Sequence, residues 1–134
     1  MADPDEHRFY VYFEQGAAAL PDAVQALTLH DLSASALDSV PESCSVVAEG
    51  LEFVVTLDES AAAAQHARAM AEQTGFRGLA ACDARFAVEV ADLPAALSEI
   101  NTMMELQGAL QDCCNGYLVL AWNDGVVEPW TVES

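Results

Sequence analysis

The chain has 134 residues, of which 53% are hydrophobic and 19% are charged, a composition typical of one globular domain and not of a disordered segment. It carries 22 acidic residues against four arginines and no lysine, which gives a formal net charge of −18. This charge excludes the basic footprint of a nucleic-acid binder and disfavours anionic membranes, and the lack of lysine excludes Schiff-base chemistry and a lysine-dependent phosphate clamp.

The acidity itself has two interpretations. An acidic surface attracts a basic partner protein. The alternative is an organism-wide bias toward acidic, lysine-poor proteins, and it is favoured because the carboxylates are spread from Asp3 to Glu133 without a long run. The N-terminal residues lack the basic and apolar regions of a secretory signal, and the apolar runs are too short to span a bilayer. A cytoplasmic protein is therefore expected.

The first half of the chain, residues 8–57, is predicted to form a β-α-β-β unit that follows a flexible acidic arm at residues 1–7. Apolar and polar residues alternate in RFYVYFE at 8–14, a pattern typical of a strand with two usable faces. Apolar residues at helical spacing predict a helix near residues 18–29. A hairpin is expected over residues 44–57, because Glu49–Gly50 can form its turn.

Two further helical segments are predicted, one within the first half and one between the halves. A short one is expected between Asp31 and Pro41, where the proline ends it. A longer helix is expected over residues 58–74, with Gly75 as its left-handed C-terminal residue and small side chains on the stripe that faces a sheet. This helix and the loop after it make residues 58–84 the link between the two units.

The second half, residues 85–132, is predicted to repeat the β-α-β-β order. Its most regular element is an amphipathic helix that begins after Asp92. The buried stripe of this helix is expected to comprise Leu97, Ile100, Met103, Met104, Gln107 and Leu110. An apolar strand at 117–122 and a tight turn follow, and Pro129 places the last strand at a sheet edge because proline lacks a backbone donor.

The similar strand sequences RFYVYF and RFAVEV, together with the shared element order, suggest an internal duplication. We therefore expect one α+β domain over residues 1–134, in which two β-α-β-β units form one mainly antiparallel sheet of about six strands with the helices packed on one face. This order of elements resembles the ligand-sensing domains of some bacterial transcription regulators. The resemblance implies an aromatic-lined cleft between the repeats, in which a glutamate binds bulky cationic molecules.

The sheet face away from the helices is predicted to carry the candidate ligand or interface residues Tyr10, Tyr12, Glu89, Trp122 and Trp130. Glu89 lies in mid-strand among apolar neighbours, where it could bind a cationic ligand beside the aromatic rings. The alternative is an ordinary exposed carboxylate on a half-buried strand. The two tryptophans flank the last hairpin, where paired aromatics stabilise a sheet or anchor an interface.

The sequence contains no nucleophile elbow, P-loop, dinucleotide fingerprint or zinc-protease motif, so no catalytic residue and no cofactor is predicted. The three histidines and four cysteines do not share a metal-ligand spacing, so no metal site is predicted either, and the cysteines are expected to be reduced. The favoured function is a non-catalytic protein-interaction or inhibitory module whose partner is a basic protein or a second copy of the chain. The alternative is a small-molecule binder that uses the aromatic sheet face, and an enzyme is the least favoured class.

Overall fold

The structure is a computed structural model that describes residues 8–14, 16, 19–29, 32–36, 43–48, 50–114, 116–120 and 125–127. The elements in chain order are β1 (Arg8–Phe13), α1 (Leu20–Leu29), β2 (Ser33–Ala36), β3 (Ser43–Ala48), β4 (Leu51–Asp58), α2 (Ala61–Thr74), α3 (Arg77–Ala80), β5 (Ala84–Val90), α4 (Leu93–Ser98), α5 (Ile100–Cys114), β6 (Tyr117–Leu120) and β7 (Gly125–Val127). None of the helices in these ranges has both the length and the hydrophobicity to cross a bilayer.

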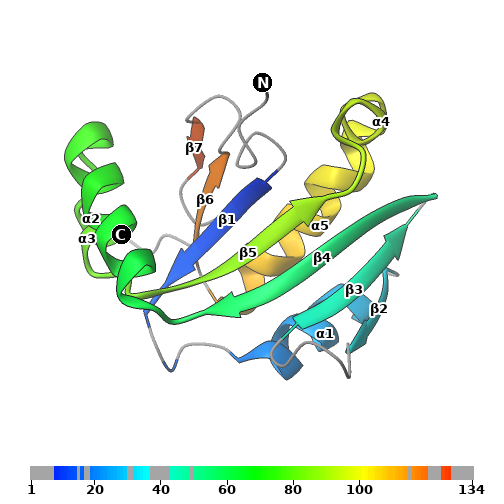
Figure 1. The fold of residues 1–134 in the computed structure, drawn as a ribbon, viewed down its shortest axis with the longest axis horizontal. Coiled ribbons are helices and arrows are strands. Elements are labelled where there is room, and N and C mark those ends of the chain that lie inside the picture. The colour runs from blue at the N-terminus through cyan, green and yellow to red at the C-terminus, as the bar shows by residue number, and fades with distance from the viewer. Residues whose placement is uncertain are drawn as a thin grey trace.

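The described strands form a single sheet in the order β2-β3-β4-β5-β1-β6-β7, and every neighbouring pair is antiparallel (Figure 1). The α+β architecture with one antiparallel sheet is thereby confirmed. At its centre, the two strands with similar sequences, β1 and β5, pair with each other, and Tyr10 lies opposite Ala87. Every residue of β1 after Arg8 is buried, so the middle of the sheet is covered on both faces.

The expectation that all helices pack on one face is wrong. Helices α1, α4 and α5 pack against one face, which Phe9, Val11 and Phe13 of β1 present to them. Helices α2 and α3 cover one end of the opposite face and bury the two tyrosines of β1 (Figure 1). The physical reason is the stripe of small residues on α2. Alanines let a helix approach a sheet closely, and this stripe packs against the second face of the sheet. The buried residues of α2 are Ala63, Ala67, Met70 and Ala71.

The strand order does not confirm the prediction of two equivalent units or of about six strands. The described part contains seven strands. In the first half, the second strand of the β3–β4 hairpin, β4, pairs with the central strands. In the second half, the first strand of the β6–β7 hairpin, β6, does so. The first half also carries the additional edge strand β2, which has no counterpart in the described part of the second half.

Two other segments differ from the expected elements. The segment expected to be a short helix contains β2, because pairing with β3 satisfies its backbone groups in an extended form. The long helix expected after Asp92 is divided into α4 and α5 by Glu99, whose φ of −108° and ψ of 53° are not helical. The predicted buried stripe is confirmed for Met103, Gln107 and Leu110 and is wrong for Leu97, Ile100 and Met104, which are exposed. The buried residues of α5 are Met103, Leu106, Gln107, Ala109, Leu110, Gln111 and Cys114.

The helix boundaries and turns predicted from glycine and aspartate are found. Gly50 and Gly75 have φ angles of 77° and 83°, which suit the β3–β4 turn and the end of α2. The Asp92 side chain accepts a hydrogen bond from the Ala95 N–H at the start of α4. The arm at residues 1–7, the turn before Gly125 and the segment around Pro129 lie outside the described residues.

Candidate functional site

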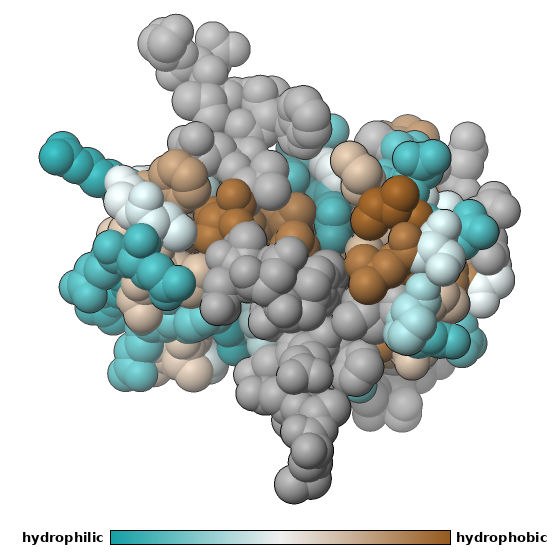
Figure 2. Space-filling model, turned by 90° about the horizontal axis from the view of Figure 1, so that it is seen from above, coloured by the Kyte–Doolittle hydropathy of each residue, from teal (hydrophilic) through white to brown (hydrophobic). Residues whose placement is uncertain are grey.

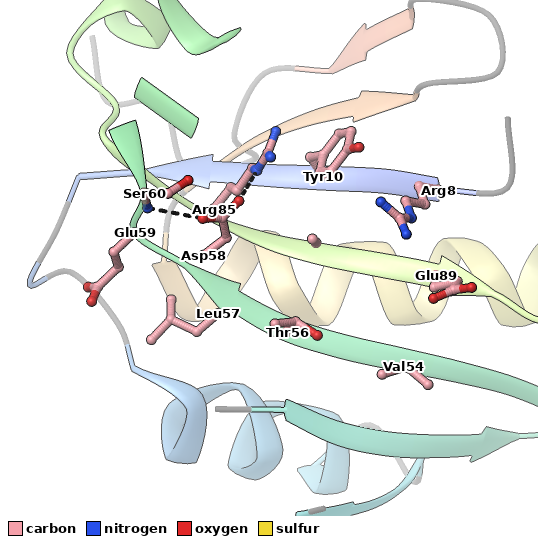
Figure 3. Close-up of a pocket in the computed structure, with 11 residues that line it drawn as sticks. Arg8, Tyr10, Val54, Thr56, Leu57, Asp58, Glu59, Ser60, Arg85 and Glu89 are labelled. Carbon is pink, nitrogen blue, oxygen red and sulfur yellow. Dashed lines mark hydrogen bonds and ion pairs between the residues drawn. The ribbon is translucent and has the colours of Figure 1, made fainter. Parts of the chain in front are cut away.

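Helices α2 and α3 cover only one end of their sheet face, and the open remainder holds a cavity of about 510 Å³ (Figure 3). The cavity lies over three neighbouring strands, β4, β5 and β1, and ends at the start of α2. Its lining residues are Arg8, Tyr10, Val54, Thr56, Leu57, Asp58, Glu59, Ser60, Arg85, Ala87 and Glu89. It is therefore placed on the sheet face opposite to α5.

The floor of the cavity exists because the central position of β5 is an alanine. Ala87 lies opposite Tyr10 on one side and opposite Thr56 on the other. Arg85 and Glu89 stand two residues away along the strand and share its face, because side chains alternate along a strand. A methyl group surrounded by four longer side chains leaves a hollow at this point.

Opposite charges lie in pairs at both ends of the hollow (Figure 3). Arg8 is the cross-strand partner of Glu89 at one end, and Asp58 is the partner of Arg85 at the other. The two pairs are four residues apart along β5, which corresponds to about 13 Å. Together with Glu59, the lining contains two arginines and three carboxylates. Half of the four arginines in this acidic chain thus line one cavity.

Arg85 holds one end of the cavity in place through contacts with three side chains. Its Nε donates to Asp58 Oδ2 at 2.7 Å, and its Nη1 donates to the Tyr12 hydroxyl at 2.9 Å. Its guanidinium lies over the Tyr10 ring, 4.3 Å from the centroid. The Tyr12 hydroxyl also contacts Nδ1 of His66 on α2. The Tyr12 hydroxyl thus lies between Arg85 on β5 and His66 on α2, and this chain of contacts connects α2 to the sheet.

Burial raises the pKa of Tyr12 far above its ordinary value, although the nearby Arg85 opposes the shift. The phenol is therefore neutral. Burial by itself would raise the pKa of Asp58, but hydrogen bonds from Ser60 and Arg85 lower it below its ordinary value of 3.8. Asp58 is thus an ionised acceptor that fixes the orientation of the guanidinium.

We expect the stability of the protein to fall in acid partly through Asp58. A carboxyl whose folded-state pKa is lowered contributes stability above its unfolded-state pKa and loses it as the pH falls through the folded-state value. Unfolding by urea at a series of pH values below and above 3.8 measures this. The wild type should lose more stability than Asp58→Asn on acidification, and parallel curves for the two proteins would contradict the assignment.

The structure places the predicted site residues in different environments. Glu89 is exposed and Tyr10 is 5% exposed, and both line the cavity. Tyr12 is fully buried below α2, where its hydroxyl is hydrogen-bonded to Arg85 and His66. It therefore does not line the cavity but holds Arg85, which does. Trp122 and Trp130 lie outside the described residues.

Three residues of the site were not singled out for it from the sequence. Asp58 looks like a helix cap in the sequence, and it does accept a hydrogen bond from the Ser60 N–H at 3.0 Å, but it also binds Arg85. Arg8 and Arg85 stand near the starts of the two similar strands. The signal that could have found them is the rarity of cations, since a chain with only four arginines places one on each of two similar strands.

The buried thiols of Cys44 and Cys82 are unsuited to nucleophilic chemistry. All four cysteines are free, and three of them are buried. Burial raises the pKa of Cys44 to about 11 and that of Cys82 to about 12, so both are protonated at neutral pH. Within the described ranges, no group of three or more histidine, cysteine or acidic side chains is arranged to hold a metal ion.

The comparisons with known proteins leave the function to be inferred from this geometry. Neither protein-family models, nor curated proteins, nor solved structures give a match to the chain.

Proposed function

We propose that the protein is a small-molecule-binding domain whose ligand occupies the cavity above Ala87. The observation that carries the proposal is a hollow of about 510 Å³ with an alanine floor, a tyrosine wall and charged pairs at both ends. Cavities of roughly 300–1,000 Å³ with an apolar base and a few placed polar groups are typical of ligand sites. The Arg85 network supports this use, because it fixes one wall before any ligand arrives.

The charges favour a ligand with a cationic group and an apolar or aromatic body. Glu89 is exposed at the open end of the cavity, and it also lines an adjoining cavity of about 240 Å³ together with Glu52. A net charge of −18 attracts cations to a concave surface more strongly than to a flat one. At this end two carboxylates, Glu89 and Glu52, stand against the single guanidinium of Arg8. At the other end Arg85 is already paired with Asp58, so its charge is largely compensated. The body of the ligand would then lie over Ala87 and beside Tyr10.

Replacing Glu89 by glutamine tests the charge preference. Suitable probes are phenethylamine, its neutral N-acetyl analogue and phenylpropionate, which share a ring and differ in charge. We expect calorimetry to detect binding of the amine only, and Glu89→Gln to weaken it roughly tenfold, because a charge-assisted hydrogen bond becomes a neutral one. The matched control is Glu72→Gln, which removes the same charge from an exposed position on α2. Equal binding of amine and acid, or an unchanged affinity of Glu89→Gln, would contradict the cationic class.

A second substitution tests the contribution of the cavity's space to binding separately from that of its charged groups. In Ala87→Phe the added ring fills the floor while every charged group stays in place, so binding of any probe should be lost. The side chain of Ala87 is partly exposed, and aromatic residues suit strands, so the variant is expected to fold. If Ala87→Phe still binds the amine with wild-type affinity, the ligand site lies elsewhere and the proposed function fails.

A further inference from the structure

Three large hydrophobic side chains form an exposed stripe on the opposite side of the sheet, at the junction of α4 and α5. Leu97, Ile100 and Met104 are 44%, 43% and 56% exposed. They are three of the five large hydrophobic side chains exposed in the described part of the chain, and they fall within eight consecutive positions. Seen from above, hydrophobic surface shows left of centre and on the right, and the right is the side on which Figure 1 has α4 (Figure 2). We call these three residues the α4–α5 stripe.

The break at Glu99 separates Leu97 on α4 from the other two stripe residues, Ile100 and Met104, on α5. The spacing of three and four residues between Leu97, Ile100 and Met104 would place them on one buried face of an uninterrupted helix. In the structure the core is instead filled from α5 by Met103 and Leu106, which are 1% and 0% exposed. The three stripe residues are therefore exposed apolar side chains close together in the chain that the core does not use, and gathered apolar surface of this kind marks interaction sites.

The charge around the stripe defines the partner. The four arginines lie on β1, α2, α3 and β5, so none belongs to the helices α1, α4 and α5 that cover this side of the sheet. The charged residues of this helix layer, including the break residue, are Asp22, Glu99, Glu105 and Asp112. A second copy docked through the same stripe would bring Glu99 and Glu105 against like charges, and an anionic membrane would be repelled as well.

We propose that the α4–α5 stripe binds a cationic amphipathic helix of a partner protein. Apolar side chains at three- and four-residue spacing on the partner would pack against Leu97, Ile100 and Met104, and lysines or arginines at its borders would face Glu99 and Glu105. Met104 suits such a surface because its flexible thioether adapts to different partners. This interaction is independent of the ligand cavity, which lies on the other face of the sheet.

Residues of the stripe and of the core beside it can be observed individually by NMR in a binding test. Ile100 is its single isoleucine, so methyl labelling of isoleucine gives one NMR signal from the middle of the stripe. Methionine labelling adds the exposed Met104 and its buried neighbour Met103 as an internal control. The probes are a Leu/Lys peptide with leucines at helical spacing and a scrambled peptide of identical composition. We expect the amphipathic peptide to shift the Ile100 and Met104 signals and to leave Met103 nearly unchanged, and the scrambled peptide to bind at least about tenfold more weakly at physiological salt.

The decisive variant replaces all three stripe residues by glutamine, which is polar and a good helix former, so folding should be preserved. It should lose the preference for the amphipathic peptide. The matched control is Leu29→Gln, because Leu29 is a 76% exposed leucine of the same helix layer that lies beside Asp112 and Cys113, near the far end of α5. Equal affinity of the two peptides for the wild type, or an unchanged preference in the triple variant, would reduce the interaction to bulk charge and overturn the proposal. Sedimentation that finds a wild-type dimer and a monomeric triple variant would overturn it too, by making a second copy the occupant.

Discussion

Gly116→Ala is expected to destabilise the protein by roughly 2–3 kcal/mol, because the added methyl group has no space. A Cβ at Gly116 would lie 2.7 Å from the Tyr12 carbonyl oxygen, 2.7 Å from Val11 Cγ1 and 2.8 Å from Cys114 Sγ. The first two of these atoms belong to β1, the central strand, which is paired on both sides and cannot move away cheaply. Gly116 is also held from its other side, since its N–H donates to the Gln111 carbonyl at 3.2 Å.

A matched glycine in the same part of the chain should respond with the opposite sign. Gly108 lies in the middle of α5, and a Cβ added there meets no atom within 4 Å. Gly108→Ala should therefore stabilise by about 0.8–1 kcal/mol through helix propensity. Urea unfolding followed by circular dichroism measures both changes. A Gly116→Ala variant as stable as the wild type would mean that β6 does not approach β1 as closely as the structure has it.

The contrast between the two glycines shows what the sequence could predict. The Asn115–Gly116 pair correctly predicts where α5 ends, because helix termination is a local property. It does not predict the close approach to Tyr12, which lies more than one hundred positions earlier in the chain. Alternation predicted β1, β4 and β5 for the same local reason, and the residues assigned to one face, such as Tyr10 and Glu89, do share it.

The placement of the helices depends on long-range packing, and the sequence-based prediction that all helices lie on one face of the sheet was wrong. The alanine stripe of α2 indicated contact with a sheet but not with which face, since both faces of β1 are hydrophobic. Helical spacing correctly predicted the burial of Met103, Gln107 and Leu110, but it also predicted that Leu97, Ile100 and Met104 are buried, and these are exposed. It did not predict the non-helical Glu99 that divides α4 from α5. No residue type at that position signals a break, because glutamate is a good helix former. The exposed stripe became visible only in the three-dimensional structure.

The candidate site was predicted in part for the same reason. Glu89 and Tyr10 could be identified as a carboxylate and an aromatic ring on a sheet face. The contacts of Arg85 with Asp58 and Tyr12 join residues 27 and 73 positions apart, and no local pattern encodes them. The rigidity of the cavity wall, which matters most for binding, is thus a property of tertiary structure alone.

Removing the guanidinium should show how much this rigidity contributes. Arg85→Ala is expected to destabilise the protein by roughly 2–4 kcal/mol, because it leaves the partly buried Asp58 carboxylate without its cation and removes a donor from the Tyr12 hydroxyl. The contact with the Tyr10 ring adds to the loss. Arg85→Lys should recover only part of the stability, since one ammonium group cannot reach both partners in the geometry of the planar fork.

A double-mutant cycle with Asp58→Ala isolates the ion pair from the rest of the network. The Arg85 and Asp58 side chains are 15% and 23% exposed, so their interaction is only moderately screened by water. If Arg85 acts mainly through Asp58, the double variant should be about as stable as Arg85→Ala alone, with a coupling energy of about 1–3 kcal/mol. Strictly additive losses in urea unfolding would assign the stability to Tyr12 and Tyr10 instead. In that outcome the guanidinium would still form the cavity wall, but the aromatic rings and not the carboxylate would hold it there.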